Sequence, residues 1–194
     1  MKNKVFGLGL SKTGTSSLTR ALTLLSYKSA HFVKVHEFDR YDAITDTPIP
    51  VIYQALDLQY PQAKFILTTR DADDWVKSFQ NHIQRQEWTK RYPKMRSDAL
   101  LATMQLYGTI HFDREKFLAG YKRYHQEVKD YFAGRESNFL VMDICQGDGW
   151  DKLCPFLGVP IPDAPFPVKN AKKNITKTKQ IASRFLHNAG LIGS

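Results

Sequence analysis

A short polar loop with two glycines follows the first apolar run of the chain. Residues 4–8 (KVFGL) form a predicted strand, and residues 9–17 (GLSKTGTSS) lead from it into a helix predicted over residues 16–25. A turn of this kind directs backbone N–H groups toward an anion, and the helix dipole assists. The alternative is a tight strand-to-helix turn without a ligand. An anion site is favoured because a lysine, two glycines and a Thr-Ser-Ser run coincide at one junction.

The position of the lysine in this loop differs from its position in the P-loop of a nucleoside triphosphatase. Gly9 and Gly14 have the GxxxxG spacing of a P-loop, but the lysine of a P-loop follows the second glycine. Here Thr15 stands at that place and Lys12 lies inside the loop. This argues against a kinase or nucleoside triphosphatase that uses Mg-ATP, which is kept as the alternative hypothesis. Asp143 would be its acidic magnesium ligand.

A second candidate anion site follows another buried strand. Residues 64–69 (KFILTT) predict that strand, Arg70 comes next, and Ser78 lies in the helix that follows. An arginine at the carboxyl end of a strand lies on the ligand side of an open α/β sheet. Arg70 and Ser78 are thus placed to share one phosphate. The alternative is a surface ion pair between Arg70 and Asp73 or Asp74.

The elements that position these loops alternate between strands and helices, which predicts an α/β fold with a parallel sheet. Further strands are expected at residues 31–36, 42–45 and 139–144. Further helices are expected at residues 48–58, from the acids at 71–74 through Ile83, and at 100–106, 117–131, 150–157 and 178–189.

The composition is that of a globular domain. The 194 residues fit one domain, 1–194, and 42% hydrophobic with 24% charged residues exclude wholesale disorder and a coiled coil. No apolar run approaches the roughly 18 residues of a membrane span. Two cysteines make no disulfide framework or zinc motif, so a cytoplasmic location is expected.

The charge of the chain is strongly positive and concentrated near its end. Twenty-eight basic residues stand against 19 acidic ones, and residues 164–194 contain six Lys or Arg and no acid. This basic C-terminal segment is either a solvated tail or a surface that faces phosphate groups. A non-catalytic protein that binds nucleotides or nucleic acid is a further alternative, although no recognition-helix or aromatic-basic pattern favours specific nucleic-acid binding.

Three segments together resemble one enzyme family. Residues 12–16 (KTGTS) resemble the 5′-phosphosulfate loop of the sulfotransferases that use 3′-phosphoadenosine 5′-phosphosulfate (PAPS). Arg70 and Ser78, with seven residues between them, resemble the 3′-phosphate motif of that family. Residues 147–160 (GDGWDKLCPFLGVP), with PFP at 165–167, are similar to a compact branch of it.

The resemblance implies a three-layer fold related to the P-loop nucleoside triphosphatases. It implies transfer of a sulfuryl group from PAPS to a hydroxyl or amine of a small-molecule, glycan or lipid acceptor, which leaves 3′-phosphoadenosine 5′-phosphate (PAP) and requires no metal. Lys12 is expected to stabilise the departing phosphate, and the N–H groups of Thr13 to Ser17 to hold the 5′-phosphate. Lys169, Asn170, Lys172 and Lys173 are expected to supply the rest of the 3′-phosphate site. The expected donor-binding residues are Lys12, Thr13, Gly14, Thr15, Ser16, Ser17, Arg70, Ser78, Lys169, Asn170, Lys172 and Lys173.

An acceptor hydroxyl also needs a base, and the resemblance points to Asp46. In the segment Ile44 to Pro48 (ITDTP), Asp46 occupies the place where many family members carry a histidine. Burial that raises the pKa of this carboxylate would suit it to proton transfer. The alternative is that Asp46 caps the helix that starts near Pro48.

Overall fold

A parallel five-stranded sheet forms the centre of the molecule. The computed structural model describes residues 3–85 and 97–168. Its strands are β1 (Val5–Gly7), β2 (Ser29–His31), β3 (Ala43–Thr45), β4 (Lys64–Thr68) and β5 (Phe139–Met142), in the order β2-β3-β1-β4-β5. Every neighbouring pair is parallel, so the carboxyl ends of all five strands meet at one edge. The predicted α/β fold is confirmed.

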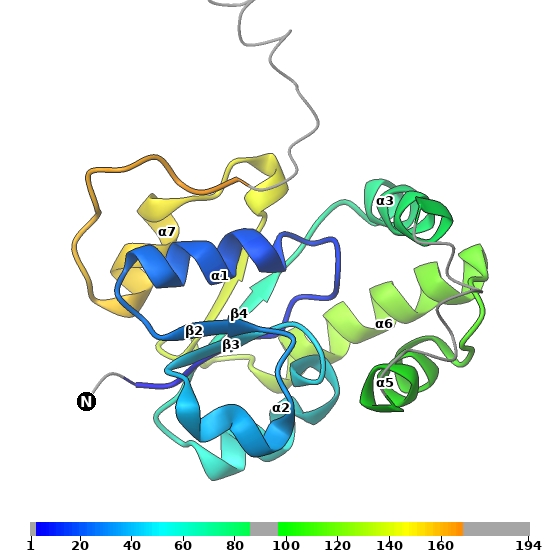
Figure 1. The fold of residues 1–194 in the computed structure, drawn as a ribbon, viewed down its shortest axis with the longest axis horizontal. Coiled ribbons are helices and arrows are strands. Elements are labelled where there is room, and N and C mark those ends of the chain that lie inside the picture. Colours follow the sequence, from blue (N-terminus) through cyan, green and yellow to red (C-terminus); the bar gives the residue numbers. More distant parts are fainter. Residues whose placement is uncertain (1–2, 86–96, 169–194) are drawn as a thin grey trace, which may run out of the picture.

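Helices cover both faces of the sheet and produce three layers (Figure 1). Helices α1 (Thr15–Leu24) and α7 (Trp150–Leu157) lie on one face. The other helices belong to the opposite side. These are α2 (Ile49–Gln59), α3 (Ala72–Arg85), α5 (Ser97–Tyr107) and α6 (Arg114–Tyr131). Two short 3₁₀ helices, η1 (Val35–Arg40) and η3 (Ile144–Gln146), complete the described elements.

Alternation along the strands divides the apolar core into two clusters. Successive side chains of a strand point to opposite faces. Val5 and Ile66 therefore pack with α1 and α7, whereas Phe6, Phe65 and Leu67 belong to the larger cluster on the other side. All five are fully buried. Burial of this kind stabilises the fold by about 2 kcal/mol per large apolar side chain.

One expected strand differs from the structure, and one expected helix is not tested by it. The strand expected over residues 31–36 is wrong, because β2 ends at His31 and the 3₁₀ helix η1 starts at Val35. Phe32 has a left-handed backbone (φ 62°), which ends the strand. The helix expected over residues 178–189 lies outside the described residues. Among the described helices, none is long and apolar enough to cross a membrane.

Helix α6 places three polar side chains beside the segments that follow β1 and β4. Tyr124 donates its hydroxyl proton to the carbonyl of Leu8 (2.7 Å), and the Tyr121 hydroxyl lies against the backbone of Arg70. His125 is buried between them, with Nδ1 2.9 Å from the carbonyl oxygen of Tyr121. Burial lowers the pKa of His125 to about 4. This histidine is therefore a neutral core residue at physiological pH.

The lowered pKa of His125 predicts a loss of stability in acid. The unfolded chain binds a proton below a pKa of about 6.5, but folded His125 binds one only near pH 4. Between pH 7.5 and pH 5 this difference removes about 2 kcal/mol of unfolding free energy. His125→Gln should lose less stability than the wild type over that range in urea unfolding. His36→Gln, at an exposed histidine, is the control and should match the wild type; equal slopes for all three proteins would contradict the assignment.

Candidate active site

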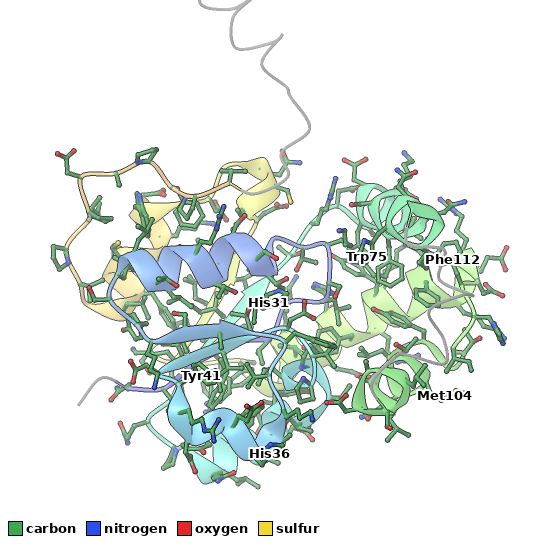
Figure 2. The ribbon with its side chains drawn as sticks, viewed as in Figure 1. His31, His36, Tyr41, Trp75, Met104 and Phe112 are labelled. Carbon is green, nitrogen blue, oxygen red and sulfur yellow. The ribbon has the colours of Figure 1, made fainter. Side chains whose placement is uncertain are left out.

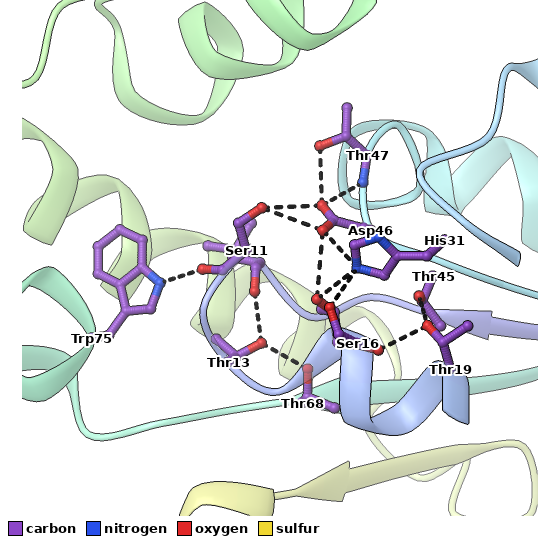
Figure 3. A network of polar contacts seen from close by, with 12 residues as sticks. Ser11, Thr13, Ser16, Thr19, His31, Thr45, Asp46, Thr47, Thr68 and Trp75 are labelled. Carbon is purple, nitrogen blue, oxygen red and sulfur yellow. Dashed lines mark hydrogen bonds and ion pairs between the residues drawn. The ribbon is translucent and has the colours of Figure 1, made fainter. Parts of the chain in front are cut away.

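The loop after β1 is held by contacts with β4 and α3. The Thr13 hydroxyl lies 2.7 Å from the Thr68 hydroxyl and 2.7 Å from the Leu10 carbonyl oxygen, and Thr13 is fully buried. The indole N–H of Trp75 donates to the carbonyl of Ser11 (2.9 Å). Figure 3 shows the contact of Thr13 with Thr68 and that of Ser11 with Trp75. The loop thus has a fixed shape before any ligand arrives.

Three consecutive N–H groups at the start of α1 are left for a ligand. The N–H of Thr13 donates to Leu10 and that of Ser17 to Gly14. No carbonyl in the described part of the chain accepts from Gly14, Thr15 or Ser16, as expected for the first turn of a helix. Gly14 has φ 104°, a conformation that favours glycine. Of the five N–H groups predicted to bind an anion, those of Gly14, Thr15 and Ser16 make no hydrogen bond to a carbonyl of the described residues, whereas those of Thr13 and Ser17 do.

Arg70 lies two residues beyond β4 and turns toward this loop. Its guanidinium Nη1 donates to the Lys12 carbonyl at 3.5 Å, a long contact. The Tyr121 hydroxyl accepts from the Arg70 N–H (3.0 Å) and donates to its carbonyl (2.6 Å), which fixes the backbone of Arg70. Ser78 lies on α3 and is half-buried. The structure thus brings Arg70 beside the first loop, as the sequence predicts.

Asp46 follows β3 and is 5% exposed. Its Oδ1 accepts hydrogen bonds from the Thr47 N–H (2.7 Å) and the Ser11 hydroxyl (3.1 Å). Its Oδ2 lies 3.1 Å from Nε2 of His31 and accepts from the Thr15 hydroxyl at 3.4 Å. Both carboxylate oxygens are therefore enclosed by donors from three different segments (Figure 3).

These donors decide the charge of Asp46. Burial raises the pKa of the carboxyl, but the hydrogen bond and charge of His31, with the bonds from Thr47 and Ser11, outweigh burial. The pKa of Asp46 is held below its ordinary value, so the expectation of a raised pKa is wrong. The capping alternative is also wrong, because α2 begins after Pro48 and has no side-chain cap. Asp46 is a buried, ionised carboxylate.

His31 is the residue of this site that sequence reasoning missed. It ends β2, and its Nε2 lies 3.2 Å from the Thr15 hydroxyl and 3.4 Å from the Ser16 hydroxyl as well as beside Asp46. Figure 2 places it next to the first turn of α1. The available signal was a histidine at the end of a strand that pairs with the strand before Asp46.

Comparison with known proteins identifies the family. A family model described as "Sulfotransferase domain" matches residues 4–39 and 35–175 of this chain. The chain belongs to this sulfotransferase family. The match includes the loop after β1, Asp46 and Arg70, so it covers the site described above.

Two further proteins are similar to this sulfotransferase. "Ava biosynthesis cluster protein M" of Aspergillus versicolor is 27% identical over an alignment of 207 residues. The alignment covers 84% of this chain and 79% of the relative. A crystal structure of a sulfotransferase from Alicyclobacillus acidocaldarius superimposes with a TM-score of 0.56 at 18% identity, over 94% of this chain and 91% of that one. The second likeness shows the shared fold.

The remaining predicted residues fall into two groups. Lys169, Asn170, Lys172 and Lys173 lie outside the described residues. Asp143, the expected magnesium ligand of the kinase hypothesis, caps the 3₁₀ helix η3 by accepting from the Gln146 N–H (3.1 Å). Within the described ranges, no group of three or more His, Cys, Asp or Glu side chains is arranged to hold a metal ion.

The packing around Gly9 gives a test of the loop architecture. A Cβ at this position would lie 1.7 Å from the Thr68 hydroxyl oxygen and 2.7 Å from that of Thr13. Gly9→Ala should therefore force these hydroxyls apart and cost about 2–3 kcal/mol of unfolding free energy. Urea unfolding measures the loss. Gly149→Ala, where the nearest contacts are at 3.6 Å, is the control and should cost less than about 1 kcal/mol; equal costs would contradict the close approach.

Proposed function

We propose that this protein transfers a sulfuryl group from PAPS to a hydroxyl or amine of a small-molecule acceptor. The observation that carries the proposal is the convergence of the KTGTS loop, Arg70 and the buried Asp46 at one sheet edge in a member of the sulfotransferase family. PAPS carries two separate anionic groups, and the chain offers two anion-binding elements on neighbouring strands.

The loop after β1 binds the 5′-phosphosulfate end of the donor. The N–H groups of Gly14, Thr15 and Ser16 supply donors at the positive end of α1, and the hydroxyls of Thr15 and Ser16 lie beside them. The buried side chain of Thr13 holds the loop through the Leu10 carbonyl and the Thr68 hydroxyl.

Lys12 stabilises the leaving group. Sulfuryl transfer, like phosphoryl transfer, depends mainly on positioning and on neutralising developing charge. Lys12 has a left-handed backbone (φ 75°). This conformation is strained for a lysine, and such strain is concentrated at functional sites. Its ammonium group offsets the negative charge that develops on the bridging oxygen as the bond to sulfur breaks.

Arg70 binds the 3′-phosphate of the donor. Tyr121 holds the Arg70 backbone, and the guanidinium reaches the Lys12 carbonyl, so the side chain lies beside the loop. Ser78 adds a hydroxyl from α3, and Lys169, Asn170, Lys172 and Lys173 complete the site. This assignment gives the basic segment at residues 164–194 a role in nucleotide binding.

The Asp46–His31 pair receives the proton of the acceptor. It lies beside the hydroxyls of Thr15 and Ser16, at the end of the loop that holds the group to be transferred. A small molecule is the favoured acceptor because one relative is named for a biosynthesis cluster. The chain acts in the cytoplasm, where PAPS is available.

Thermal unfolding with nucleotides tests the donor. PAP at about 100 times its dissociation constant should stabilise the fold by roughly 2.7 kcal/mol. Lys12→Ala and Arg70→Ala should both reduce this shift, because each removes a cation from one anion site. Arg114→Ala is the matched control, since its side chain is 52% exposed and pairs with Asp73 on the surface, and it should keep the full shift.

The same experiment separates the two nucleotide hypotheses. ATP with Mg²⁺ should give a smaller shift than PAP. A clear shift with Mg-ATP and none with PAP would reject the sulfotransferase proposal in favour of a kinase or nucleoside triphosphatase.

A further inference from the structure

The contacts of the Asp46–His31 pair indicate which of the two side chains accepts the proton. Asp46 accepts hydrogen bonds at both oxygens and is almost fully buried. A third of the His31 side chain is exposed, compared with 8% of the Asp46 side chain. An acceptor molecule can therefore reach the imidazole more easily than the carboxylate.

The contact at Nε2 fixes which nitrogen of His31 carries the proton. Burial raises the pKa of Asp46, but its hydrogen-bond donors and the charge of His31 lower it by more. The carboxylate is therefore ionised and can only accept hydrogen bonds. Nε2 lies 3.1 Å from Oδ2 and must therefore be the N–H of the ring. In the neutral imidazole the lone pair is then on Nδ1. This atom has no hydrogen-bond partner among residues 3–85 and 97–168.

The backbone holds both residues in place. His31 pairs with Thr45 in the sheet register, and the N–H of Phe32 donates to the Thr45 carbonyl (3.0 Å). Phe32 and Asp46 both have left-handed backbones, with φ of 62° and 72°. Non-glycine residues in this region are strained, and such strain is concentrated at functional sites. The two strand ends thus turn together and bring the two side chains into contact.

We propose that His31 is the general base of the sulfuryl transfer, acting through Nδ1, and that Asp46 is the residue that positions it. This inference rests on the proposed function. As the acceptor oxygen or nitrogen forms its bond to sulfur, its proton passes to Nδ1. The sulfur–oxygen bond to the phosphate breaks, and its electron pair stays on PAP. Asp46 stabilises the imidazolium that results, as the carboxylate of a Ser-His-Asp triad does.

The surroundings of the pair support a histidine base. Among the described residues, Tyr107 on α5 lies close enough to feel the charge of Asp46. Burial, with the charge of Asp46 as a smaller cause, raises the pKa of Tyr107 far above its usual range. Tyr107 therefore stays protonated and is no candidate for the base.

The variant His31→Gln tests the assignment. The glutamine amide N–H can replace Nε2–H toward Asp46, so the site keeps its hydrogen bonds and loses only the basic nitrogen. PAP release from PAPS, with water as the acceptor, should fall at least 100-fold. PAP binding, measured by thermal shift, should change less than threefold. His36→Gln is the matched control and should release PAP at the wild-type rate.

Nitrogen NMR of the ring separates this inference from the donor assignment. In the wild type without nucleotide, ¹⁵N shifts should show a protonated Nε2 and an unprotonated Nδ1 for His31. Asp46→Asn should weaken this tautomer preference and lower turnover. A proton on Nδ1, or equal PAP release by His31→Gln and the wild type, would overturn the assignment. Failure of the wild type to bind PAP would instead reject the proposed function. The NMR spectrum, recorded without nucleotide, would still test the tautomer of His31.

Discussion

The site depends on the close approach between the loop after β1 and the end of β4. The hydroxyls of Thr13 and Thr68 lie 2.7 Å apart in the buried interior, and Gly9 leaves just enough space for them. This contact fixes where α1 begins and so where the Gly14–Ser16 N–H groups lie. It also sets the distance to Arg70, two residues beyond β4. A parallel sheet makes the approach possible because all its strands end at one edge.

The second constraint is electrostatic. A buried carboxylate beside an anion-binding loop is costly unless donors surround it. Asp46 meets this requirement with Ser11 and Thr15 from the loop, Thr47 from its own turn and His31 from β2. The loop after β1 and the Asp46–His31 pair therefore share side chains. Under the proposed function, donor binding and orientation of the base would be coupled through the Ser11 and Thr15 hydroxyls.

The sequence was sufficient for the fold and the loop but not for the whole site. The parallel sheet followed from apolar runs that alternate with amphipathic helices, and the loop followed from two glycines and a lysine after a strand. His31 was missed because β2 is three residues long and partly exposed, so its end could not be found from hydrophobic alternation. The direction of the Asp46 pKa was also missed, since burial was predictable from sequence and the donors that oppose it come from distant segments.

The most direct test of the central claim is a crystal structure of this chain with PAP. The account predicts the 5′-phosphate within hydrogen-bond distance of the Gly14, Thr15 and Ser16 N–H groups, with the Arg70 guanidinium on the 3′-phosphate. His31 and Asp46 should remain in contact beside the 5′-phosphate. A PAP molecule bound at another edge of the sheet, or a 3′-phosphate far from Arg70, would contradict it.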